Sequence, residues 1–121
     1  MGIEYSTENR KKYFFVKSCG ESDDLDEISR YAHEITELCK QLGHSNILID
    51  ETNRQYILGE VLDLYKLANF LKTLDIATLN IAIVCLPEYL EQIRFFETTA
   101  NNHGMNIKFF LETNRAEQWL L

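Results

Sequence analysis

Residues 79–86, with the sequence LNIAIVCL, form an almost uninterrupted apolar stretch that ends at Pro87. A strand with one face in water alternates apolar and polar residues, and this stretch does not. It therefore predicts a strand that is covered on both faces, as in a parallel sheet. Pro87, the single proline of the chain, ends this strand and suits the first position of a following helix.

Shorter apolar blocks predict four further strands, at residues 3–7, 12–17, 46–50 and 106–110. The polar segment 8–11 between the first two predicts a hairpin with a four-residue loop. We expect a turn at residues 19–24 and a polar loop at residues 51–54, directly after the third strand.

Apolar residues recur at helical spacing in the segments between these strands. Asp24 is a good N-cap for the first helix, and Glu27 stands three residues later, as in a capping box. The apolar face of this helix is expected to contain Leu25, Ile28, Ala32, Ile35, Leu38, Cys39 and Leu42. A second helix is expected at residues 61–71, a third between Pro87 and Gly104, and a short last one in which Trp119 is buried.

The predicted order is therefore β-β-α-β-α-β-α-β-α. After the first hairpin, each pair of strands is separated by a helix long enough for a right-handed crossover. We therefore expect one α/β domain, residues 1–121, with a mostly parallel sheet and an antiparallel first strand.

The C-terminal third of the chain carries a pattern of residues that is similar to a known family. This pattern consists of Glu97, Ala100, Gly104, Met105, Ile107 and Phe110, followed by Ala116, Glu117, Trp119 and Leu120. Together with the hairpin and the β-α steps, it resembles the STAS-like (SpoIIAA-like) family, and its end is similar to stand-alone bacterial members. These are packing motifs, which specify a fold better than a function.

The resemblance implies a SpoIIAA-like fold and a role in binding protein partners or small ligands, as in anti-sigma-factor antagonists. Antagonist members have a phosphorylatable serine in an Asp-Ser-x-Gly turn after the third strand. In this chain Gly59 matches that turn, but Ile57 and Leu58 stand in place of the acid and the hydroxyl. We therefore expect no phosphorylation at this turn, and Thr52 is the nearest hydroxyl that modification could use.

Composition narrows the range of partners. The net charge of −7 and the isoelectric point near 4.9 argue against nucleic acid and anionic membrane surfaces. No apolar run approaches the roughly 20 residues of a membrane span. Three widely spaced cysteines are typical of free thiols in a reducing compartment, so we expect a cytoplasmic protein. No motif for a metal, phosphate or catalytic triad is recognisable, and we expect no cofactor.

The carboxyl end of the third strand is the most promising position for a site, because open α/β sheets bind ligands at this edge. A rim made by Asp50, Glu51, Thr52, Arg54 and Tyr89 is the candidate crevice for a ligand or partner. The alternative is a solvated loop in which Asp50 accepts hydrogen bonds from backbone N–H groups.

Large apolar residues follow this loop at Tyr56, Ile57 and Leu58. They indicate either an interface, with a partner or a second copy in a homodimer, or packing beneath the second helix. We interpret the chain as a non-catalytic binding or regulatory module for a protein partner or a small ligand. The alternative is a small enzyme or a carrier of an apolar ligand that uses Asp50 and Glu51.

Overall fold

The computed structural model describes residues 2–56 and 61–121, without the side chains of residues 61–64. Its single sheet has the strand order β1-β2-β3-β4-β5. The strands are β1 (Gly2–Asn9), β2 (Phe14–Ser22), β3 (Asn46–Tyr56), β4 (Asn80–Val84) and β5 (Asn106–Phe110). β1 is antiparallel to β2, and the other neighbours are parallel, so the predicted order and directions are confirmed.

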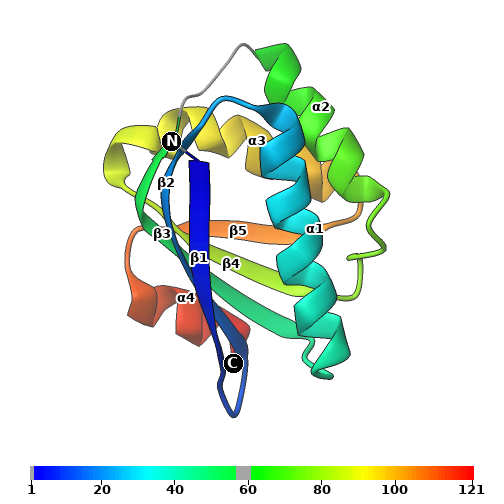
Figure 1. Ribbon diagram of the computed structural model, residues 1–121, viewed down its shortest axis with the longest axis vertical. Helices are drawn as coiled ribbons and strands as arrows, with labels where there is room; N and C mark the ends of the chain where they lie inside the picture. Colours follow the sequence, from blue (N-terminus) through cyan, green and yellow to red (C-terminus); the bar gives the residue numbers. More distant parts are fainter. Residues whose placement is uncertain (1, 57–60) are drawn as a thin grey trace.

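Four α-helices connect or follow the strands, and a short 3-10 helix, η1 (Pro87–Tyr89), precedes the third. They are α1 (Leu25–Gln41), α2 (Val61–Lys72), α3 (Leu90–Asn102) and α4 (Thr113–Leu120). The first three helices cover one face of the sheet, and α4 lies on the opposite face (Figure 1). No helix in the described part of the chain is both long enough and apolar enough to cross a membrane.

The interior strands bury apolar side chains on both faces, as the sequence predicts. In β3, Ile47 and Ile49 face the core under α1, α2 and α3, whereas Leu48 between them packs with Ala116 and Leu120 of α4. β4 alternates in the same way between the two cores. The side-chain period of two thus explains why residues 47–49 of β3 and 81–84 of β4 are apolar at every position.

The predicted turn at residues 19–24 is wrong, because β2 continues to Ser22 and pairs with β1 from Phe14 to Glu21. Gly20 makes this possible: its φ is +96°, and a Cβ at this position would lie 2.0 Å from the carbonyl oxygen of Gly2. Asp24 caps α1 as predicted, with its side chain accepting from Asp26 N. The capping box is not formed, since the Glu27 carboxylate accepts from Ile3 N in β1.

Two predictions about helix faces also need correction. Tyr31 of α1 is buried, whereas Leu38 and Leu42 are 36% and 46% exposed, so the buried face is turned toward Tyr31. Trp119 is half-buried rather than buried, and its ring packs against Phe110 with centroids 5.8 Å apart. The helix α4 nevertheless docks on the sheet through two buried residues, as expected.

Candidate functional site

The predicted loop at residues 51–54 is part of β3, and an irregularity in this strand creates the site. β2 and β3 pair in register as far as Lys17 and Asp50, and pairing resumes at Cys19 and Asn53. Two steps in β2 therefore match three steps in β3, which is a β-bulge with the extra residue in β3. As a result, Glu51 and Arg54, which would otherwise point to opposite faces, both point toward α1, α2 and α3.

Asp50 and Thr52 hold the bulge. The Asp50 Oδ1 atom accepts hydrogen bonds from Thr52 N at 3.0 Å and from Thr52 Oγ1 at 2.7 Å. This is the local turn geometry in which an aspartate side chain replaces a backbone partner. Asp50 accepts a backbone N–H group, as in the alternative considered for it, but it does so within a strand and not in a solvated loop, and neither residue lines the cavity described below.

A buried cluster of polar side chains surrounds Glu51, whose exposed fraction is 6%. Its Oε2 atom lies 3.1 Å from Arg54 Nη1 and 3.0 Å from the Tyr31 hydroxyl, and its Oε1 atom accepts from the Tyr56 hydroxyl. The Tyr31 hydroxyl also lies 3.1 Å from Ser18 Oγ. Because a phenol has one proton and a carboxylate can only accept, Tyr31 donates to Glu51 and accepts from Ser18.

Burial and charge keep this cluster in one protonation state. Burial and then the Glu51 carboxylate raise the pKa values of Tyr31 and Tyr56, so both hydroxyls stay neutral donors. Burial is the largest influence on the pKa of Arg54 and lowers it, but the charge of Glu51, the two tyrosines and the hydrogen bond to Glu51 together outweigh burial and leave this pKa raised. The cluster therefore contains one cation and one anion, and its formal charge is zero.

The guanidinium of Arg54 contacts two tyrosine rings and Glu51 but uses few of its N–H donors. Its guanidinium carbon lies 5.5 Å from the ring centroid of Tyr31 and 5.2 Å from that of Tyr56, as in cation–π contacts. The side chain is 5% exposed, and within residues 2–56 and 61–121 its buried Nε atom has no hydrogen-bond partner. A buried N–H without an acceptor is unfavourable and is uncommon outside functional sites.

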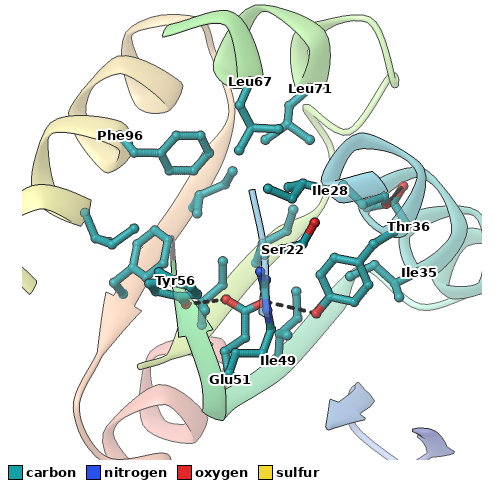
Figure 2. A pocket seen from close by; sticks show the side chains of 18 of the residues that line it. Ser22, Ile28, Ile35, Thr36, Ile49, Glu51, Tyr56, Leu67, Leu71 and Phe96 are labelled. Atoms are coloured by element: carbon teal, nitrogen blue, oxygen red, sulfur yellow. Dashed lines mark hydrogen bonds and ion pairs between the residues drawn. The ribbon is translucent and has the colours of Figure 1, made fainter. Parts of the chain in front are cut away.

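The cluster forms part of the wall of an apolar cavity of about 460 Å³ between the sheet and α1, α2 and α3. Figure 2 shows Leu67, Leu71 and Phe96 on the side opposite Glu51 and Tyr56. The other residues of the wall are the apolar Leu25, Ile28, Ala32, Ile35, Ile49, Ile76, Ile81, Ile83, Ile93, Ile107 and Phe109, and the polar Ser22, Asp23 and Thr36. The volume falls within the range of roughly 300–1,000 Å³ that is typical of small-molecule sites.

The structure brings together only part of the predicted rim. Glu51, Arg54 and Tyr56 line the cavity, and Tyr89 packs on Tyr56 with ring centroids 4.7 Å apart. Tyr56 is half-buried and faces the cavity, which agrees better with packing beneath the second helix than with an exposed patch, the two alternatives considered for it. Ile57 and Leu58 lie outside the described residues, so the rest of that patch stays a prediction.

Sequence reasoning missed Tyr31 and Ser18, which complete the cluster. Tyr31 stands between Ile28 and Ile35 at helical spacing, and this position could have identified it as an inward-facing residue. Ser18 carries no such signal, because its inward direction depends on how far β2 extends.

Comparison with known proteins identifies the architecture. No family model and no curated protein matches this sequence. Among solved structures, an anti-sigma factor antagonist from Mycobacterium paratuberculosis is similar to this chain, with a TM-score of 0.64 and 16% identity over 98% of this chain and 94% of that one. A second similar structure is an uncharacterised protein of the DUF3478 family from Shewanella loihica PV-4, described as having a SpoIIAA-like fold. Its TM-score is 0.52, with 22% identity over 99% of this chain and 94% of that one.

The fold is SpoIIAA-like. The sheet order, the antiparallel first strand and the near-complete coverage of both chains agree with this assignment. The resemblance seen in the sequence is therefore confirmed at the level of the fold. At these identities the likeness shows the fold alone, and the function must be argued from the site.

Proposed function

We propose that this protein is a non-catalytic binding module with a SpoIIAA-like fold, and that it binds a mainly apolar small molecule in the cavity between the sheet and α1–α3. The observation that carries this proposal is the cavity of about 460 Å³, whose wall is apolar except for a few convergent polar groups. An interior of this size costs stability when it is empty, because the lining side chains lose packing contacts. A ligand that fills it recovers those contacts.

The hydrogen bonds of the Glu51 carboxylate favour a role in binding over a role in acid–base catalysis. Its two carboxylate oxygens receive hydrogen bonds from Tyr31, Tyr56 and Arg54. These donors engage both oxygens inside the fold, so the carboxylate is placed to hold the cluster together and not to take a proton from a ligand. The buried thiol of Cys85, near this cluster, has its pKa raised to about 11 by burial and by Glu51, so it is not an activated nucleophile.

A regulatory role through a protein partner is a second part of this proposal, supported by the named function of the Mycobacterium paratuberculosis protein. We expect such regulation to act without phosphorylation of the turn after the third strand, where antagonist members of the family have their serine. Thr52 is half-buried and donates its hydroxyl proton to Asp50, so a kinase would have to break the bulge to reach it. Binding of a ligand in the cavity is the alternative signal, and it could change how the protein binds its partner.

The cavity can be tested with a substitution that fills it. Ala32 lies on α1 and lines the cavity, whereas its neighbour His33 is exposed. We expect Ala32→Leu to weaken binding of the neutral apolar dye N-phenyl-1-naphthylamine by at least about tenfold, and His33→Leu to leave it unchanged. Fluorescence titration measures both, and equal affinity in the wild type and Ala32→Leu would contradict the proposal.

A further inference from the structure

The charges and donors in the cavity wall also specify the class of ligand. This inference rests on the proposed function, because it assumes that the cavity binds a small molecule. We infer that the ligand of this cavity is uncharged and carries a hydrogen-bond acceptor oxygen, such as a carbonyl or hydroxyl, that binds the guanidinium of Arg54.

The first step concerns the donors of Arg54. A guanidinium has five N–H groups. Within the described residues, the hydrogen bond of this guanidinium runs from Nη1 to Glu51 Oε2 at 3.1 Å, and its buried Nε has no partner. Arg54 is also part of the cavity wall. An acceptor atom on the ligand would therefore complete a hydrogen-bonding group that the protein leaves incomplete, and a pure hydrocarbon would not.

The second step concerns charge. Arg54 is already neutralised by Glu51, and the two atoms that join them lie 3.1 Å apart in a pair whose side chains are 5% and 7% exposed. A ligand anion beside Arg54 would also lie close to the Glu51 carboxylate, and repulsion between like charges is strong away from water. Asp23, which is exposed and also lines the cavity, adds a further negative charge. These charges disfavour an anionic ligand.

A cationic ligand is disfavoured by Arg54 itself. The guanidinium places a positive charge in the wall, where it repels a ligand cation, and it lies over the rings of Tyr31 and Tyr56, so it already uses the faces of these two rings. The hydroxyls of both tyrosines donate to Glu51, which leaves that carboxylate fully engaged. Of the other polar residues in the wall, Thr36 donates to carbonyl oxygens of α1 and the Ser22 hydroxyl accepts from Asp24 N, so donation from Arg54 remains a main polar function of the wall and favours a neutral acceptor.

Two matched pairs of dyes test the inference. N-phenyl-1-naphthylamine and 8-anilinonaphthalene-1-sulfonate share a skeleton and differ by a sulfonate charge. Prodan, a neutral naphthalene ketone, and its 6-propyl analogue differ by the carbonyl oxygen. In the wild type we expect the sulfonate to weaken binding by about tenfold, because of charge repulsion. We expect the carbonyl of Prodan to strengthen binding by about tenfold, as for one hydrogen bond to a charged group.

Substitutions assign these preferences to the buried pair. Glu51→Gln leaves Arg54 without its counter-charge, so we expect the sulfonate dye to bind about tenfold more tightly than to the wild type. In Glu51→Gln with Arg54→Met, the preference for the carbonyl should disappear, and the sulfonate dye should lose the affinity that it gains in Glu51→Gln alone, because an apolar cavity without a cation disfavours an anion. The matched control is Glu112→Gln with Arg115→Met, which removes an exposed pair of the same i,i+3 spacing at 3.5 Å and should change neither.

The outcomes separate the two proposals. If none of the four dyes binds to the wild-type cavity, the proposed function fails. If N-phenyl-1-naphthylamine binds and Ala32→Leu blocks it, but the sulfonate dye binds the wild type as tightly or the Prodan carbonyl gives no advantage, the cavity proposal stands and the inference about the ligand is overturned. Circular dichroism and urea unfolding verify that each variant is folded before its titration is interpreted.

Discussion

Glu51 and Arg54 stand three positions apart in one β-strand, yet their side chains point to the same side and form a buried ion pair at 3.1 Å. In a regular strand, residues at this spacing face opposite sides of the sheet. The bulge between Asp50 and Asn53 removes that conflict by adding one residue to β3. The polar wall of the cavity therefore depends on a local irregularity of the backbone.

The side chain of Asp50 is expected to maintain this irregularity. Asp50→Ala removes two hydrogen bonds to Thr52, each worth about 1 kcal/mol, so we expect a loss of about 1–2 kcal/mol in the free energy of unfolding. The exposed Asn53 in the same strand provides the control, and Asn53→Ala should change stability by less than about 0.5 kcal/mol. Urea unfolding compares the two, and an equal effect would show that Asp50 does not hold the bulge.

The buried pair should behave non-additively. Arg54→Met alone leaves the Glu51 carboxylate buried without its counter-charge, and we expect it to cost about 3–5 kcal/mol. The double variant Glu51→Gln with Arg54→Met removes both charges and should cost clearly less than the sum of the single changes. A double-mutant cycle by urea unfolding measures this coupling. Simple additivity of the two single effects would mean that the charges do not interact in the folded protein.

The three thiols should differ sharply in reactivity. Cys19 is exposed, whereas Cys39 and Cys85 are buried, and burial raises the pKa of each buried thiol to about 11. Since the thiolate is the reactive form, Ellman's reagent at pH 8 should modify Cys19 rapidly and the other two only on unfolding. Cys19→Ser should abolish the fast phase. Two or more fast equivalents in the native wild type would contradict the placement of Cys39 or Cys85.

Trp119 should contribute less to stability than a fully buried aromatic residue. It is half-buried against Phe110, so we expect Trp119→Ala to cost about 1–2 kcal/mol, below the roughly 3–5 kcal/mol of a fully buried aromatic side chain. Its fluorescence in the native protein should lie between that of buried and of free indole. Emission at the position of free indole in water would contradict the docking of α4 on the sheet.

The sequence predicts the order of the elements well, because the interior strand β4 is apolar at residues 81–84 without a break and the helices carry one apolar face. It fails where a strand is polar. Residues 51–54 read as a loop because Glu51 and Arg54 are charged, and the bulge breaks the period of two that would mark a strand. Tyr31, which lies 20 residues from Glu51 in the sequence, donates a hydrogen bond to the Glu51 carboxylate and so stabilises its burial.

The cavity itself could not be predicted from the sequence. Its wall combines side chains from α1, α2, α3 and the sheet, and each of these residues alone fits an ordinary core position. What distinguishes a ligand site from a filled core is the space left between elements, and periodicity does not report that space. The sequence did identify Glu51, Arg54 and Tyr56 as candidates, although at an exposed rim instead of inside the fold.

The most direct test of the cavity proposal is methyl NMR spectroscopy of the protein with labelled isoleucine during titration with N-phenyl-1-naphthylamine. Ile49 and Ile83 line the cavity, whereas Ile3 and Ile47 do not. We predict that the methyl signals of Ile49 and Ile83 shift and saturate with the dye, while those of Ile3 and Ile47 change little. A ligand site inside this fold would be contradicted if the saturating shifts were confined to the methyl signals of Ile3 or Ile47. It would also be contradicted if the dye bound without shifting the methyl signals of Ile49 and Ile83.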